Sequence, residues 1–180
     1  MNKKLLTHFQ SKRLSIEERI NTGKELRNKF PRFKLGEYKP AANRTDPVSI
    51  LEEQAKTRLP NLVPIRYARM LTSPFAFLRG AAAIMAADLS SNNKTSGITV
   101  QACGDMHLAN FGVFGSAERN LVFGINDFDE TLPGPWEWDL KRLVASIVVC
   151  GRYLGVSKSL REESVITAVS TYRKRMKQYA

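Results

Sequence analysis

Cysteine is scarce in this chain. Only two cysteines occur in 180 residues, Cys103 and Cys150, and they form no C-x-x-C pair. This excludes a zinc ribbon, a thioredoxin-type redox motif and a disulfide framework. A chain of this length buries enough surface to fold without disulfides or structural metals. Two free thiols suit a reducing compartment, and we expect the protein to be cytoplasmic.

Long apolar runs are absent as well. The longest covers residues 143–150 and is interrupted at Ser146, far short of the roughly 20 residues that cross a bilayer. The basic amino terminus, which reads MNKKLLTH, is not followed by the apolar stretch of a secretory signal peptide. We therefore expect no membrane span and no membrane partner.

Acidic residues are few, with 17 Asp and Glu against 28 Lys and Arg, a net charge of +11. Residues 1–70 carry 16 basic and 7 acidic side chains, residues 71–150 carry 5 and 8, and residues 151–180 carry 7 and 2. Basic ends raise the question of a polyanionic partner. The acidic centre instead favours a divalent-cation site, so we expect nucleic acid not to be the partner.

Breaker residues divide the chain into two parts. Residues 1–43 are predicted to form a basic helical extension and a linker, with a capping box at Ser15 and Glu18 and extended chain from 31 to 47. Asp46 followed by Pro47 marks a helix start, and that helix is expected to end near residue 59. Residues 44–180 are expected to form one domain.

Hydrophobic periodicity predicts an α+β fold that is mostly helical and contains one β-hairpin. We expect a strand at residues 75–79, a helix at 80–89, a strand at 98–103, hairpin strands at 111–115 and 121–125, and helices at 138–150 and from Ser159 onward. Ser159 and Glu162 are predicted to cap the last helix.

The helix at 138–150 is predicted to belong to the core, because apolar residues recur on one of its faces. These residues are Leu140, Leu143, Val144, Ile147 and Val148. Lys141 and Arg142 are expected on the opposite face.

The segments that flank the hairpin carry the chemistry. Residues 103–112 read CGDMHLANFG and residues 125–130 read INDFDE. An Asp followed five residues later by Asn and, after a hairpin, by Asp-Phe is the order in which kinases present a catalytic base and two magnesium ligands. Both segments meet at one end of the hairpin, so Asn110 and Asp127 can converge on a cation while Asp105 faces an acceptor hydroxyl.

One carboxylate, one amide oxygen, water and phosphate oxygens are sufficient ligands for Mg²⁺. We therefore predict Asp105 as the catalytic base and Asn110 and Asp127 as metal ligands, with Mg²⁺ and ATP as cofactors. Asp129 is a further candidate for the metal, and a loop-capping role fits it equally well. His107 is predicted to be a packed, hydrogen-bonded loop residue.

Arg79 is a candidate contact for the phosphates of a nucleotide, because its guanidinium suits a phosphate. A buried structural ion pair is the simpler interpretation of this residue.

The loop and metal segments at residues 103–140 resemble small-molecule kinases of the aminoglycoside and choline kinase type. A closer resemblance, over residues 44–155, is to the uncharacterised bacterial family called domain of unknown function 2252, and it rests on residues 62–70, 73–80, 103–112 and 126–143. The resemblance implies a protein-kinase-like fold and identifies Asp139 as the helix aspartate that braces the loop. Cys103 stands where the small-molecule kinases have histidine.

A glycine-rich loop and its paired lysine are missing, because the chain contains no G-x-G-x-x-G and no V-A-I-K-like run. The resemblance implies that these parts follow later in longer members of the family, in circularly permuted order. We therefore expect residues 44–180 to be a partial kinase-like domain that corresponds to the amino-terminal part of such a member. Its remainder would be missing or separately encoded, and the chain inactive or weakly active alone.

The function expected from these residues is phosphotransfer from Mg-ATP to a hydroxyl of a small molecule or another, unknown acceptor. Two alternatives to this function remain open. One is a non-catalytic basic interaction or nucleic-acid-binding protein that uses its charged ends. The other is a metal-dependent phosphohydrolase in which water is the acceptor.

Overall fold

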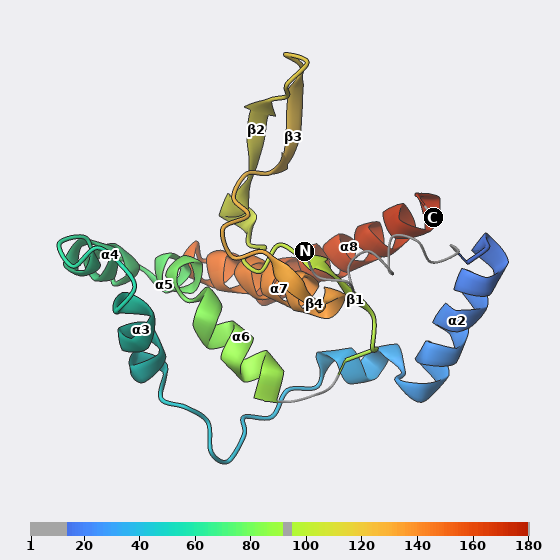
Figure 1. The fold of residues 1–180 in the computed structure, drawn as a ribbon, viewed down its shortest axis with the longest axis horizontal. Coiled ribbons are helices and arrows are strands. Elements are labelled where there is room, and N and C mark those ends of the chain that lie inside the picture. Colours follow the sequence, from blue (N-terminus) through green and yellow to red (C-terminus); the bar gives the residue numbers. More distant parts are fainter. Residues whose placement is uncertain (1–13, 92–94, 180) are drawn as a thin grey trace, which may run out of the picture.

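The computed structural model describes residues 14–91 and 95–179, and it shows a mixed α+β protein made mainly of helices (Figure 1). Two small antiparallel sheets lie in its second half. Within the described ranges, no helix has the length and apolarity that crossing a membrane requires.

The amino-terminal part begins with helix α2 (Ile16–Lys29), followed by the 3-10 helix η1 (Arg32–Gly36). The capping box is confirmed, because Ser15 Oγ accepts from the Glu18 amide at 3.2 Å and the Ser15 amide donates to Glu18 Oε2 at 2.7 Å. The η1 turn interrupts the stretch predicted as extended. The part of the prediction that concerns residues 1–13 lies outside the described residues.

Four short helices follow, α3 (Pro47–Ala55), α4 (Val63–Met70), α5 (Pro74–Gly80) and α6 (Ala82–Ser91). Asp46 caps α3 as predicted, although that helix ends before residue 59. A small apolar core lies among α3, α4 and α6 and is formed by Leu51, Met70, Ala81 and Ile84. Arg44 and Asp88 join the linker to α6 through two hydrogen bonds of 2.6 and 2.8 Å.

The predicted strand at 75–79 is wrong, because these residues form α5. Ser73 Oγ accepts from the Ala76 amide at 3.0 Å, and Pro74 occupies the first turn. A side-chain cap followed by proline is a helix start, the same signal as Asp46-Pro47, and it outweighs the β propensity of two phenylalanines.

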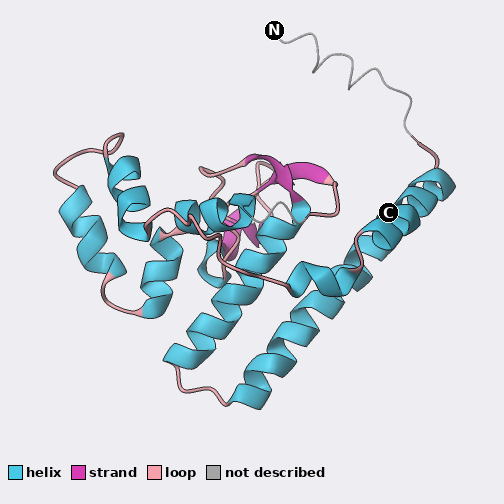
Figure 2. Ribbon diagram, turned by 90° about the horizontal axis from the view of Figure 1, so that it is seen from below, coloured by secondary structure: helices cyan, strands magenta, loops and turns pink. Residues whose placement is uncertain are grey.

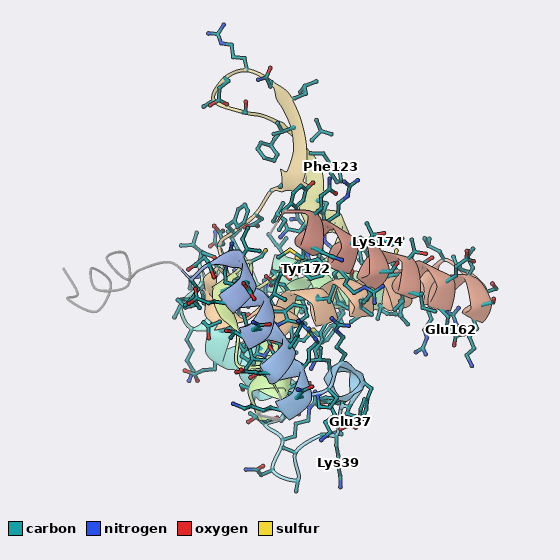
Figure 3. The ribbon with its side chains drawn as sticks, turned by 90° about the vertical axis from the view of Figure 1, so that its right-hand side faces the viewer. Glu37, Lys39, Phe123, Glu162, Tyr172 and Lys174 are labelled. Carbon is teal, nitrogen blue, oxygen red and sulfur yellow. The ribbon has the colours of Figure 1, made fainter. Side chains whose placement is uncertain are left out.

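Strand β1 (Thr99–Ala102) pairs with β4 (Leu132–Pro135), and β2 (Phe111–Gly115) pairs with β3 (Leu121–Ile125). The predicted hairpin is confirmed, with Phe111 opposite Ile125. Figure 1 shows the hairpin projecting away from the helices. Its Phe123, labelled in Figure 3, is 72% exposed and stacks on Phe111.

The last two helices, α7 (Trp136–Tyr153) and α8 (Lys158–Gln178), run antiparallel and lie side by side (Figure 2). Trp136 of α7 stacks on Tyr172 of α8, with ring centroids 5.9 Å apart. The predicted cap is wrong in position, since Ser157 and not Ser159 accepts from the Leu160 amide.

The buried face of α7 is polar, contrary to the prediction that its aliphatic residues form the core. Glu137, Arg142 and Ser146 are buried, whereas Leu143 and Val144 are only half-buried. Arg142, which was expected opposite the core, is 3% exposed. The reason lies in what covers α7: the loop between β1 and the 3-10 helix η2 (Leu108–Asn110) presents polar groups that need partners.

Candidate functional site

The loop between β1 and η2 holds Asp105, the predicted base. Its Oδ1 accepts from Arg142 Nε at 2.5 Å, and its Oδ2 lies 3.5 Å from His107 Nε2. Burial acts to raise the pKa of Asp105, but the hydrogen bond of His107 and the charge and hydrogen bond of Arg142 outweigh it and hold that pKa below its ordinary value. Asp105 is therefore an ionised carboxylate that can orient a hydroxyl near neutral pH.

Arg142 is the buried residue that holds the Asp105 carboxylate in place. Its guanidinium also donates to the Leu78 carbonyl of α5 at 2.7 Å, and its Nη1 lies 3.8 Å from the Met85 sulfur of α6. One buried side chain thus joins α5, α6, α7 and the loop. Because a buried guanidinium without its carboxylate would be costly, Arg142 and Asp105 stabilise the loop only together.

His107 is a packed loop residue, in agreement with the prediction. It is 5% exposed and meets the Phe75 ring edge-on, with 6.4 Å between ring centroids. Its Nδ1 is buried and has no hydrogen-bond partner among the described residues.

Asn110 joins the two segments that flank the hairpin. Its Nδ2 donates to the carbonyl oxygens of Asp105 and Asp127 at 3.1 and 3.0 Å, and its Oδ1 accepts from the Asp127 amide at 2.9 Å. Its backbone carbonyl accepts from the Asn126 amide at 2.9 Å. The buried amide of Asn110 therefore sets where Asp127 stands relative to Asp105.

Asp127 and Asp129 are exposed at the end of the same segment. Asp127 Oδ1 accepts from the Asp129 amide at 3.0 Å, a turn that orients the Asp127 carboxylate. The structure thus places Asp127, but not the side chain of Asp129, among the residues that line the cleft described below.

Asp139, near the start of α7, holds the beginning of the loop. Its carboxylate oxygens accept from the amides of Cys103 at 2.8 Å and Gly104 at 3.0 Å. Cys103 is buried, which raises the pKa of its thiol, and its sulfur lies 3.6 Å from the Asp127 carbonyl. The contact between the two segments that flank the hairpin is therefore made at this position without a histidine.

A cleft of about 1090 Å³ opens over these residues. Asp105, Asn110 and Asp127 line it together with Arg58, Arg66, Arg69 and Arg79 from the loop before α4, from α4 and from α5. Arg79 is exposed and pairs with no carboxylate among the described residues, so the interpretation as a buried ion pair is wrong.

The cleft offers few protein ligands for a metal, which suits a cation that keeps much of its water shell. The described residues contain no group of three or more His, Cys, Asp or Glu side chains that could hold a metal. Asp127 offers an exposed carboxylate, and Asn110 Oδ1 keeps one lone pair beside its bond to the Asp127 amide. Such a sparse donor set fits Mg²⁺, which keeps several waters and takes its remaining ligands from phosphate.

Several residues of the site escaped sequence reasoning. Arg142 is predicted from the sequence to lie opposite the apolar face of its helix, and Ser146 only interrupts an apolar run. In the structure Arg142 binds Asp105, and Ser146 Oγ accepts from the Leu108 amide at 3.0 Å. Arg66 and Arg69 carried a signal, because residues three apart on one helix face the same side, whereas Arg58 in the preceding loop carried none.

Comparison with known proteins gives one match. The family described as "Uncharacterized protein conserved in bacteria (DUF2252)" matches residues 58–180, which include every residue of the cleft named above. Neither the curated proteins nor the solved structures contain a match.

Proposed function

The chain belongs to the DUF2252 family of bacterial proteins, and we propose that it provides the catalytic-loop side of a magnesium- and ATP-dependent phosphotransferase. The observation that carries the proposal is the set of hydrogen bonds between the Asn110 side chain and the backbone of Asp105 and Asp127. These bonds hold the two aspartates at one cleft although 22 positions separate them in the sequence. A base, an amide and a carboxylate in this order are what phosphotransfer in kinases uses.

The arrangement of the chain around Asn110 supports the same function. The paired strands β1 and β4 come before and after the loop, the hairpin and the Asp127 segment in the sequence. Asp139 of the following helix, α7, accepts hydrogen bonds from the amides at the start of the loop. Hydrogen bonds with the backbone position the side chains of Asn110 and Asp127, and the Arg142 side chain positions the carboxylate of Asp105. This is the preorganisation that positioning catalysis needs.

In the proposed reaction the acceptor hydroxyl attacks the γ-phosphorus, the bond to the bridging oxygen of ADP breaks, and the hydroxyl proton leaves for Asp105 or for water. Asp105 orients that hydroxyl through its carboxylate, which Arg142 keeps ionised and fixed. Asp127 and Asn110 would hold Mg²⁺, which offsets charge on the phosphoryl oxygens when bound. The glycine-rich loop and paired lysine of a kinase are not among these 180 residues.

The experiment is a thermal unfolding series with Mg-ATP, ATP in EDTA, and no nucleotide. Ligand at about 100 times its Kd stabilises the folded state by roughly 2.7 kcal/mol, a rise in Tm of several degrees. We expect this rise with Mg-ATP for the wild type and for Glu163→Gln, an exposed acid on α8, and we expect Asp127→Asn to lose it. An equal rise in Asp127→Asn, or none in the folded wild type, would contradict the proposal.

A further inference from the structure

Four arginines gather on one wall of the cleft. Arg58 lies in the loop between α3 and α4, Arg66 and Arg69 are on α4, and Arg79 is in the last turn of α5. We call these four residues the arginine cluster. Helices α4 and α5 pack against each other, and Arg66 Nη2 donates to the Gly80 carbonyl at the end of α5 at 2.5 Å.

Among the residues that the structure describes, no carboxylate pairs with the arginine cluster. Arg58, Arg69 and Arg79 form neither a hydrogen bond through the side chain nor an ion pair with any residue that the structure describes. Arg66 binds two neutral oxygens, the Gly80 carbonyl and Gln54 Oε1 at 3.2 Å, and its Nη1 is buried with no described partner.

The carboxylates of the cleft do not supply the missing balance. Asp105 is committed to Arg142, which leaves Asp127 as the acidic residue of the cleft lining without a basic partner among the described residues. Burial lowers the pKa of Arg66, and the charge of Arg58 lowers it further. The charge of Glu130 opposes these two effects without cancelling them. Arg66 is therefore partly withdrawn from water beside another cation, whereas Arg58, Arg69 and Arg79 are exposed.

An anion in the cleft would relieve this excess of positive charge. Guanidinium groups match the oxygens of phosphate with paired hydrogen bonds, and a concave wall of one sign concentrates the field on such a ligand. The cleft volume of about 1090 Å³ is far larger than a free phosphate ion and suits a small molecule that bears phosphate.

We propose that the arginine cluster binds a phosphate group of the small molecule that occupies the cleft. The inference deepens the proposed function, on which it rests only for the identity of that molecule, either the nucleotide or a phosphorylated acceptor. The binding itself needs neither Mg²⁺ nor Asp127.

The test is titration calorimetry with pyrophosphate in EDTA, using the full chain. Arg69→Gln/Arg79→Gln removes two exposed arginines of the cluster, and Arg152→Gln/Arg173→Gln removes two exposed arginines of α7 and α8. The two variants have equal net charge. Each hydrogen bond to a charged group that is lost should weaken binding about tenfold. We expect a loss of at least that size in the cluster variant alone.

Equal weakening in both variants, or no pyrophosphate binding by the folded wild type, would overturn the proposal. Circular dichroism of both variants establishes that they are folded. Asp127→Asn in EDTA should keep its affinity for pyrophosphate, so a failure of the phosphotransfer proposal leaves this result unchanged. Addition of Mg-ATP separates the two sources: displacement of pyrophosphate assigns the cluster to nucleotide phosphates, and simultaneous binding assigns it to a phosphorylated acceptor.

Discussion

Gly104 shows how tightly the structure specifies a single residue of the loop between β1 and η2. Its φ is +82°, and a Cβ at this position would lie 2.0 Å from the Glu130 carbonyl oxygen. The loop and the Asp127 segment can therefore approach each other only when this residue is glycine.

We predict that Gly104→Ala lowers the free energy of unfolding by about 3 kcal/mol or more, because conformational strain and a backbone clash add. Gly155→Ala is the matched control, since its φ is +71° and its Cβ would have no described atom within 4 Å. That variant should cost only about 1–2 kcal/mol. Urea denaturation measures both, and equal costs would show that the Glu130 contact is not there.

Asp105 makes the stability of the protein depend on pH. Its pKa in the folded state is below the ordinary value of 3.8, because the His107 and Arg142 contacts outweigh burial. Its contribution is therefore fully present above about pH 4, the unfolded pKa, and is lost as pH falls through the folded pKa.

Unfolding free energies of the wild type and Asp105→Asn should differ by about 2 kcal/mol at pH 7, the size of a charged hydrogen bond. The difference should shrink as pH falls below about 4. The exposed pair of Arg44 and Asp88 also titrates in acid, and it cancels because both proteins contain it. A difference that stays constant down to pH 2 would show that Asp105 is not held ionised by its neighbours.

For single residues, sequence spacing predicted that Asp105, Asn110 and Asp127 lie close together, and the three residues line one cleft. This was predictable because the hairpin between them is a local structure with clear turn residues. It could not locate Arg142. Helical periodicity assigns a charged residue to the solvent face, and only the polar loop lying across α7 reverses that assignment.

Among the elements, even a helix that the sequence predicts can begin at a different residue in the structure. Helix α8 was expected to start at a capping box of Ser159 and Glu162, yet Ser157 Oγ accepts from the Leu160 amide at 3.3 Å. Two serines two residues apart offer the same chemistry. The choice is made by the turn after α7, where Gly155 takes a positive φ and the Val156 amide donates to the Gly151 carbonyl.

We predict that Ser157→Ala lowers the free energy of unfolding by about 1 kcal/mol, the usual cost of losing a side-chain cap. Ser159→Ala should change it by less than about 0.5 kcal/mol, because this residue lies inside the first turn and is exposed. Thermal or urea unfolding of the pair decides which serine caps α8. The reverse order of effects would restore the cap predicted from sequence.

At the scale of the whole molecule, the fold brings together two parts of the chain with opposite charge. The basic segment of residues 1–70 supplies three members of the arginine cluster, Arg58, Arg66 and Arg69. The acidic centre of residues 71–150 supplies Asp105 and Asp127, together with the fourth arginine, Arg79. Composition alone shows that the chain has a basic part and an acidic part. It does not show that both parts line one cleft. Their meeting depends on long-range contacts such as the bond of Arg142 to the Leu78 carbonyl, which no local pattern encodes.

The proposed role of Asp127 and Asn110 as the metal side of a nucleotide cleft can be tested by paramagnetic broadening with Mn-ATP in NMR spectra. Manganese takes the same oxygen ligands as magnesium. We expect the Asn110 side-chain amide and the backbone amide of Asp127 to broaden first, while Glu118 at the hairpin tip and Glu163 on α8 keep their signals. Broadening that is strongest on α8 or on the hairpin tip would contradict this proposal.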